Sequence, residues 1–230
     1  MYLVLFALPL SAAGPLTHAF LTEMYLMQHS SYSNEEKDLF RIGSLFPDIR
    51  HLAETERDHT HFPHVTLQEV FLEASPFIAG MKYHAYVDKK REAFMERGGH
   101  YNLISDLPLA YPRNFLKFVE DEIIFTSLNR NDWRVLLQNT VPEEMEWGIR
   151  EEVVIKWHQL LDWTLTFLPS TLIYFADVQG NGLLSMPADE ISIWNANVYE
   201  RAHRAEVRAY FNSMLKMFDE SVKGLFKTNK

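Results

Sequence analysis

Apolar residues recur at helical spacing along most of this 230-residue chain, and this periodicity decides the fold class. Over residues 142–168, and again over 185–226, apolar side chains return every three or four positions, which places them on one face of a helix. No apolar–polar alternation of five or more residues, bounded by turn residues, indicates a strand. The sequence therefore predicts an all-α fold, a multi-helix bundle.

Start and stop signals divide this pattern into separate helices. Ser33 with Glu36, and Thr66 with Glu69, have the spacing of capping boxes, and a glycine pair at 98–99 is typical of a helix end. We expect loops at 45–48, 57–64 and 100–111, and helices over residues 16–28, 34–43, 67–74, 77–96, 114–128, 132–139, 142–168 and 185–226. These helices are predicted to form a single domain of residues 14–230.

Residues 1–13 form a separate apolar segment that ends in small residues. This segment is either an export signal, which predicts a periplasmic or secreted protein, or an apolar arm packed on the domain of a cytoplasmic protein. Cleavage after Ala13 would make Gly14 the new N-terminus, four residues before His18. The segment is shorter than the roughly 20 residues that span a bilayer.

Composition excludes several kinds of site. The formal net charge is −9 and no Lys/Arg-rich run occurs, which argues against a protein that binds nucleic acid by neutralising many phosphates. The chain has no cysteine, so zinc–thiolate fingers, thiol nucleophiles and disulfides are excluded. Any metal must therefore be held by His, Asp and Glu.

The predicted helix over 77–96 carries the strongest candidate for such a site. His84 and Asp88 are four residues apart and project from one face, where both can bind a single cation. Imidazole and carboxylate are ordinary zinc ligands. The competing interpretation is a buried hydrogen bond between the two side chains that only stabilises the helix.

Upstream segments supply further candidates. His18 falls in the first turn of the helix over 16–28, and Asp48 lies in a predicted loop, where a short carboxylate can turn to meet a metal. The loop over 57–64 contains His59, His61 and His64, any one of which can supply an imidazole ligand. Segments far apart in sequence can converge on one cavity of a helical bundle, as they do in carboxylate and histidine metal sites.

These candidates lie in four short segments with recognisable neighbours. The segments are Gly14-Pro15-Leu16-Thr17-His18, Gly43-Ser44-Leu45-Phe46-Pro47-Asp48-Ile49, Thr60-His61-Phe62, and Ala79-Gly80-Met81-Lys82-Tyr83-His84-Ala85-Tyr86-Val87-Asp88. In this order they resemble the bacterial zinc-dependent phospholipase C family, which is related to the fungal single-strand nucleases. The resemblance covers roughly residues 14–90 and implies a multi-helix bundle of the phospholipase C type.

The resemblance also implies a zinc cluster. One zinc would be bound by His18 with Asp88, and the other by Asp48, His61, His84 and Asp88, so that Asp88 bridges the two ions. Asp48 is in addition the candidate general base. The implied reaction is hydrolysis of a phosphodiester by a metal-activated hydroxide.

The implied substrate is a glycerophospholipid, reached by transient contact with a membrane surface, and no stable nucleic-acid complex is expected. Two other functions stay open. One is a single-strand nuclease or phosphatase on the same scaffold. The other is a non-catalytic helical binding module that the metal stabilises. The sequence predicts neither the head group nor the oligomeric state.

We expect two zinc ions and not a third. Family members bind a third ion through a histidine soon after the bridging aspartate and through a later His-x-x-x-Glu, but the position six after Asp88 is Phe94. The nearest replacements are His100 and the pair His158 and Asp162, which are four residues apart.

Several other residues are predicted to have no part in the metal site. His29 and His51 are expected at the surface, and the acidic run at 120–122 is expected on a solvated helix face. Most aromatic residues are expected in the core, with Phe62, Tyr83 and Tyr86 as the candidates to line an entrance for acyl chains.

Overall fold

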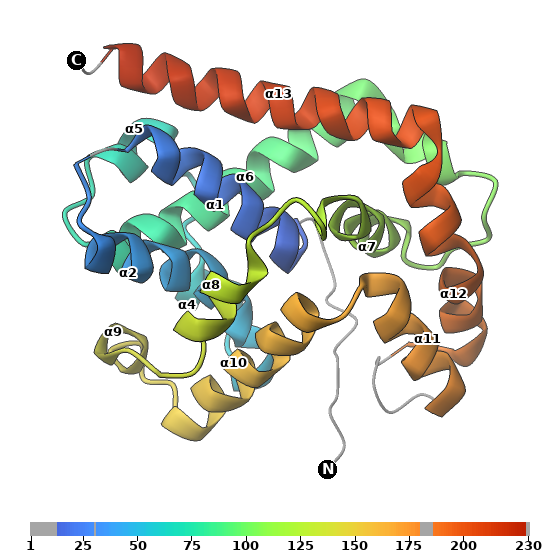
Figure 1. The fold of residues 1–230 in the computed structure, drawn as a ribbon, viewed down its shortest axis with the longest axis horizontal. Helices are drawn as coiled ribbons and strands as arrows, with labels where there is room; N and C mark the ends of the chain where they lie inside the picture. Colours follow the sequence, from blue (N-terminus) through green and yellow to red (C-terminus); the bar gives the residue numbers. More distant parts are fainter. Residues whose placement is uncertain (1–12, 30, 180–185, 229–230) are drawn as a thin grey trace.

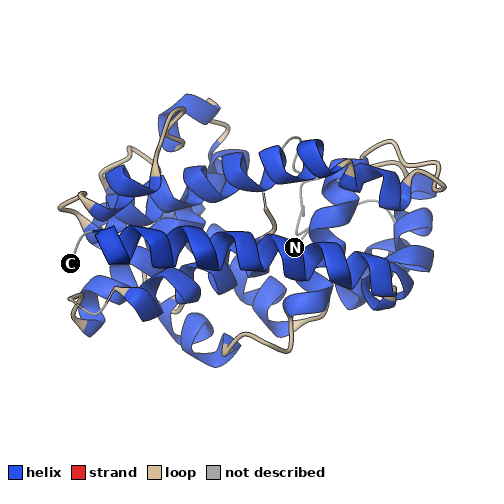
Figure 2. Cartoon of the chain, turned by 90° about the horizontal axis from the view of Figure 1, so that it is seen from above, coloured by secondary structure: helices blue, strands red, loops and turns tan. Residues whose placement is uncertain are grey.

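The computed structural model describes residues 13–29, 31–179 and 186–228, and these residues form helices and no strand, as Figure 1 and Figure 2 show. The all-α multi-helix bundle is thus confirmed. The long helices are α1 (Pro15–Gln28), α2 (Asn34–Leu45), α6 (Pro76–Gly98), α7 (Pro112–Ile124), α10 (Glu151–Thr166), α11 (Pro169–Gln179), α12 (Ala188–His203) and α13 (Ala205–Thr228). Shorter elements connect them: η1 (Phe46–Ile49), α3 (Arg50–Ala53), α4 (Arg57–Thr60), α5 (Leu67–Phe71), η2 (His100–Ile104), α8 (Arg130–Leu136) and α9 (Pro142–Met145).

The helices pack in two groups that α7 and α13 connect. α1, α2, α5 and α6 pack on one another on the left of Figure 1, and α7, α11 and α12 pack on one another on the right. α1 contacts both α7 and α13, and α12 contacts α13. No helix among the described residues is long and apolar enough to cross a membrane. Residues 1–12, on which the predicted export signal falls, lie outside the described residues.

The predicted helix starts in the first half of the chain are confirmed. α1 places His18 in its first turn, and both capping boxes form, because Ser33 and Thr66 accept the backbone N–H groups of Glu36 and Glu69. α6 ends at Gly99, whose φ of 61° is left-handed and costs glycine little. His84 and Asp88 therefore sit on successive turns of one uninterrupted helix.

Two glycines let α2 and α6 approach each other closely. A Cβ on Gly80 would lie 2.2 Å from the carbonyl oxygen of Phe40, and a Cβ on Gly43 would lie 2.1 Å from that of Phe77. These distances are well below van der Waals contact, so both positions require glycine. The close approach places the carbonyl of Ser44, at the end of α2, within hydrogen-bonding distance of His84.

Two predicted long helices are wrong, because each is broken in the structure. Gly148 has a φ of 68°, which the interior of a helix does not allow, and it separates α9 from α10. Arg204, with a ψ of 135°, separates α12 from α13. No glycine or proline marks this second break. Instead, the buried Arg201 binds the Leu103 carbonyl and Asp106, which ties the end of α12 to the segment after η2.

Three predicted loops contain helical turns, and α11 has no counterpart in the prediction. Asp48 lies in η1 and not in a loop, since proline is tolerated in the first turn of a helix and Pro47 stands there. α4 gives the histidine segment a helical turn over Arg57–Thr60, and η2 does the same over His100–Ile104. Each turn restricts the direction in which its side chains point.

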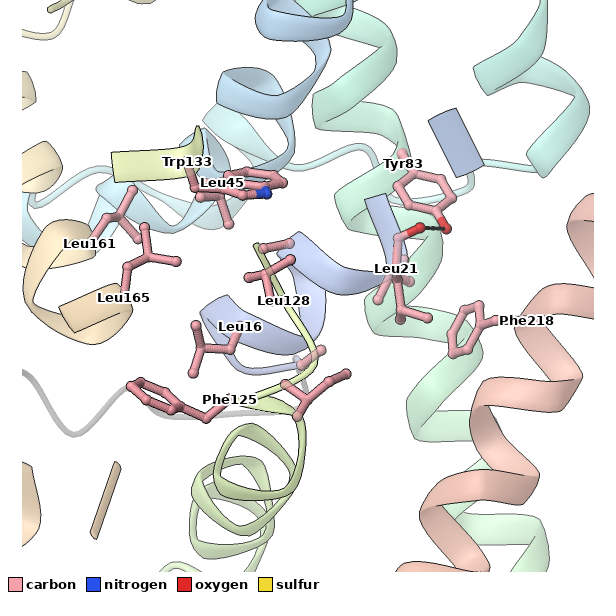
Figure 3. Packing of buried hydrophobic residues seen from close by; sticks show 14 of the residues in the cluster. Leu16, Leu21, Leu45, Tyr83, Phe125, Leu128, Trp133, Leu161, Leu165 and Phe218 are labelled. Atoms are coloured by element: carbon pink, nitrogen blue, oxygen red, sulfur yellow. Dashed lines mark hydrogen bonds between the residues drawn. The ribbon is translucent and has the colours of Figure 1, made fainter. Parts of the chain in front are cut away.

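A single core cluster extends through both groups of helices, from Leu16 of α1 to Trp194 of α12. Figure 3 shows the part of this core around Leu16, Leu45 and Trp133. Tyr83 belongs to this core, because it is fully buried and its hydroxyl donates to the Leu21 carbonyl at 2.9 Å. The prediction that Tyr83 lines an acyl-chain entrance is therefore wrong.

The acidic run at 120–122 is also buried, contrary to the prediction of a solvated face. Glu120 pairs with the buried Arg91, and Glu122 accepts hydrogen bonds from Ser170. Asp121 accepts the Leu16 and Thr17 backbone N–H groups and so caps the start of α1. All three carboxylates thus hold helices together, which the sequence pattern did not reveal.

Candidate metal centre

Four elements bring the five predicted ligands into one buried cluster. His18 comes from α1, Asp48 from η1, His61 from the residue after α4, and His84 and Asp88 from α6. None of these residues is more than 6% exposed. Ligand atoms of two sets lie within 4.8 Å of one another: His18, His84 and Asp88, and Asp48, His61 and His84. This buried group could hold a metal ion.

The His84 ring is oriented by the backbone of α2. Its Nδ1 lies 2.9 Å from the Ser44 carbonyl oxygen, which can only accept, so Nδ1 carries the proton. Nε2 therefore presents a lone pair when the ring is neutral, and this buried atom has no hydrogen-bond partner. A histidine whose far nitrogen is fixed by a backbone carbonyl is the arrangement found in metal-ligating histidines.

Two linked hydrogen bonds orient the His61 ring in the same way. The Thr60 hydroxyl donates to the Pro47 carbonyl at 2.8 Å and must therefore accept from Nδ1 of His61, which lies 3.0 Å from it. Nε2 of His61 is again a buried atom without a hydrogen-bond partner. The contact between η1 and α4 thus fixes the tautomer of a second ligand.

Both Nε2 atoms face carboxylate oxygens. Nε2 of His84 lies 3.5 Å from Oδ2 of Asp88 and 3.9 Å from Oδ1 of Asp48, and Nε2 of His61 lies 3.9 Å and 3.7 Å from the same two oxygens. Ligands about 2.0–2.2 Å from a tetrahedral zinc stand roughly 3.3–3.6 Å apart. The four atoms therefore surround a space that fits one ion after shifts of a few tenths of an ångström.

His18 lies on the other oxygen of Asp88. Its Nε2 is 3.1 Å from Oδ1, and its ring stacks on that of His84 with centroids 3.9 Å apart. The backbone N–H of Ala13 donates to the same oxygen at 3.0 Å. Asp88 thus directs Oδ2 to the group around His84 and Oδ1 to His18, which is the geometry of a bridging carboxylate.

The electrostatics of the cluster favour a bound cation. Burial works against the charge of Asp48, but His84 and His61 outweigh it and lower its pKa to about 2. Burial and the neighbouring His84 lower the pKa of His18 to about 4 and that of His61 to about 3. Burial also lowers the pKa of His84, but Asp88 and Asp48 outweigh it and the net shift is upward. The two carboxylates that raise the pKa of His84 would also attract a metal ion.

Three basic residues beside the cluster were not predicted to belong to it. His51 lies on α3 with its Nε2 3.8 Å from Oδ1 of Asp48, so its predicted surface position is wrong. His51 follows Asp48 by three residues, a spacing that brings side chains together in a helix. The contact was missed because Asp48 was predicted to lie in a loop. Arg57 donates to Oδ2 of Asp88 at 2.9 Å. Lys117, from α7, is buried, and its pKa is lowered by burial.

An open cleft of about 520 Å³ reaches the cluster from solvent. His61 and Asp88 line it together with Arg57, His64 and Lys89. A metal that only stabilised the fold would need no such access. The cleft therefore allows a dissolved substrate or product to reach the cluster.

A second cavity, of about 80 Å³, is largely apolar. Ala13 and His51 line it, and both also contact the carboxylates of the cluster. The remaining walls include Trp157 and Leu161 of α10 and Trp194 of α12. A hydrocarbon-lined space thus adjoins the charged cluster.

Of the three clustered histidines, only His61 belongs to the metal cluster. His59 is exposed, and its Nε2 lies 2.8 Å from the Trp147 carbonyl oxygen. His64 is exposed on the cleft. His29, expected at the surface, is buried against the Tyr32 ring at a centroid distance of 3.8 Å.

The candidates for a third metal site have other partners. Nε2 of His158 lies 2.8 Å from Oε1 of Glu144. Asp162 accepts a hydrogen bond at its Oδ1 from Nε of Arg134, at 2.7 Å. His158 and Asp162 are thus each satisfied elsewhere. The His100 ring stacks between aromatic rings, with centroids 4.8 Å from Phe94 and 5.2 Å from Tyr210.

Comparisons of the chain with models of protein families, with curated proteins and with solved structures find no match. The function is therefore argued from the geometry of the cluster and its surroundings.

Proposed function

We propose that this protein is a zinc-dependent phosphodiester hydrolase, a phospholipase C that acts on glycerophospholipids. One observation carries the proposal. Two histidines with fixed tautomers turn unpartnered Nε2 atoms toward two carboxylates, and one residue of each pair, His61 and Asp88, lines an open cleft. Zinc suits this mixture of imidazole and carboxylate ligands.

Zinc bound between Asp48, His61, His84 and Asp88 would supply Lewis acidity for phosphate oxygens and would activate water at neutral pH. A second ion would share Asp88 and bind His18. The backbone N–H of Ala13 donates to Oδ1 of Asp88, so a chain that began at Ala13, and not at Gly14, would place a free amine beside this oxygen.

Asp48 orients the attacking water in this proposal. Its ion-pair contacts with His51, His61 and His84 all use Oδ1, which leaves Oδ2 to accept a hydrogen bond from water. Because its pKa is about 2, Asp48 stays a carboxylate throughout the neutral range. It therefore acts through its position and negative charge more than as a strong base.

The surroundings of the cluster favour a lipid over a nucleic acid. The apolar cavity beside Ala13 and His51 suits hydrocarbon and offers few groups to a sugar–phosphate chain. The net charge of −9 disfavours binding of a polyanion.

An exposed aromatic ridge supports contact with a membrane surface. It consists of Trp163, Phe167, Tyr174 and Phe175, whose neighbouring rings lie 6.0–6.4 Å apart and which are 36–52% exposed. The ridge lies on and between α10 and α11, the helices that also supply walls of the apolar cavity. Tryptophan and tyrosine favour the boundary between water and lipid. An exported protein would meet such a surface outside the cell.

The experiment compares two substrates with one zinc-loaded preparation. Release of diacylglycerol from phosphatidylcholine vesicles, with no cleavage of single-stranded DNA, supports the phospholipase. The reverse result favours the nuclease. Zinc that raises the melting temperature without either activity favours the non-catalytic binding module.

A further inference from the structure

Arg57 stands between the cluster and the cleft. It is the first residue of α4, and its Nη2 donates to Oδ2 of Asp88 at 2.9 Å. This is the oxygen that faces Nε2 of His84 and of His61. The guanidinium thus lies at the mouth of the space that fits an ion.

The guanidinium is also open to the cleft. Its side chain is 38% exposed and lines the cleft, whereas Asp88 is 3% exposed. Among the described residues, only its Nη2 makes a hydrogen bond or ion pair, so Nε and Nη1 keep donors for a ligand. Arg57 can therefore bind Asp88 and a molecule in the cleft, or exchange one for the other.

The charges around the cleft leave Arg57 as the group that faces an anion. Of the wall carboxylates other than Asp88, Glu92 and Glu96 are already paired with Arg113, and the exposed Asp58 makes no ion pair among the described residues. Lys89 lines the cleft too, but it is exposed and makes no ion pair within the described part of the chain. The fork of an arginine matches two oxygens of a phosphate, which a lysine cannot do.

We propose that Arg57 is the phosphate-binding residue of this cleft: it pairs with Asp88 in the metal-free protein and donates to non-bridging phosphate oxygens once metal is bound. The proposal rests on the proposed function for the presence of metal. A divalent ion on Oδ2 of Asp88 competes with the guanidinium for the charge of that oxygen and repels it, which frees Arg57 to meet the anion. The class of ligand is a phosphate mono- or diester.

The test measures binding of inorganic phosphate to the zinc-loaded protein by equilibrium dialysis, with zinc content determined on the same samples. The variants are Arg57→Met, Arg57→Lys and, as a matched control that removes a charge from the same cleft, Lys89→Met. We expect Arg57→Met to weaken phosphate binding about 10- to 100-fold, since hydrogen bonds between charged groups are strong. The phosphate affinity of Arg57→Lys should lie between those of Arg57→Met and the wild-type protein, and that of Lys89→Met should stay within about threefold of the wild-type value.

Three results would overturn the proposal. The first is unchanged phosphate binding in Arg57→Met. The second is an equal loss of phosphate affinity in Arg57→Met and Lys89→Met, which would show that only the overall electrostatic potential of the cleft matters. The third is loss of zinc from both Arg57 variants, which would assign Arg57 to assembly of the metal site. If phosphate binds through Arg57 but no phosphodiester is cleaved, the proposed function fails and this inference stands.

Discussion

The contact between α2 and α6 gives a prediction that links the fold to the cluster. In Gly80→Ala, the new Cβ would lie 2.2 Å from the Phe40 carbonyl oxygen and 2.8 Å from the Ser44 backbone nitrogen. The helices must therefore separate by about 1 Å. Overpacking of this kind costs about 1–3 kcal/mol, and here it meets backbone that cannot rotate away, so the upper end applies.

Alanine regains about 1 kcal/mol because it favours helix more than glycine does. The net loss in free energy of unfolding is then about 2 kcal/mol, which lowers the melting temperature of a domain of this size by about 4–8 °C. The same displacement draws the Ser44 carbonyl away from Nδ1 of His84, now 2.9 Å distant. Loss of such an outer partner typically weakens metal binding by about 10- to 100-fold.

Urea unfolding of the metal-free protein, followed by circular dichroism, measures the first effect, and competition with a chelator measures the second. Gly224→Ala is the control, since a Cβ there meets nothing within 4 Å in α13. It should stabilise the protein by up to about 1 kcal/mol and leave zinc affinity unchanged. A Gly80→Ala protein as stable as wild type, with wild-type zinc affinity, would refute the reasoning.

Three further predictions follow from the cluster and the ridge. Among the three histidines of the cluster only His84 has a raised pKa, so zinc should displace about one proton between pH 5 and 6.5, and zinc affinity should fall about tenfold per pH unit as pH decreases. Calorimetry in buffers of different ionisation enthalpy counts the displaced protons, and a count near three would contradict this expectation. His61→Ala should lose the metal, whereas His59→Ala should keep it, as elemental analysis of the two proteins can show. The double variant Trp163→Ser with Phe175→Ser should bind phosphatidylcholine vesicles about tenfold more weakly, as measured by co-sedimentation, and should still hydrolyse a short-chain monomeric substrate at the wild-type rate. An equal loss of vesicle binding and of monomer hydrolysis would exclude a specific role for the ridge.

Much of the fold followed from local signals. The start of α1, both capping boxes and the long α6 were predictable because the residues that start and end these helices are near neighbours in sequence. The break at Arg204 was not predictable, because no residue there disfavours helix and the contacts of Arg201 with a distant segment decide it. The burial of Glu120 was likewise hidden, since its partner Arg91 lies on another helix.

For the candidate site, spacing predicted that His84 and Asp88 share a helix face, and the family resemblance added His18, Asp48 and His61. The structure brings all five together. Spacing could not predict which atoms point inward. That depends on carbonyl groups of other segments. The Ser44 carbonyl fixes the ring of His84, and the Pro47 carbonyl fixes that of His61 through the Thr60 hydroxyl. The contact of His51 with Asp48 was missed because Asp48 was predicted to lie in a loop and not in the helical turn η1.

We propose that the two unpartnered Nε2 atoms and the two carboxylates bind a catalytic zinc. The zinc content of the purified protein and of His84→Ala, with phosphatidylcholine hydrolysis measured on the same samples, tests this proposal. We predict zinc in the wild-type protein together with hydrolysis, and loss of both in the variant. No bound metal in the wild-type protein, even after zinc is added back, would contradict the account.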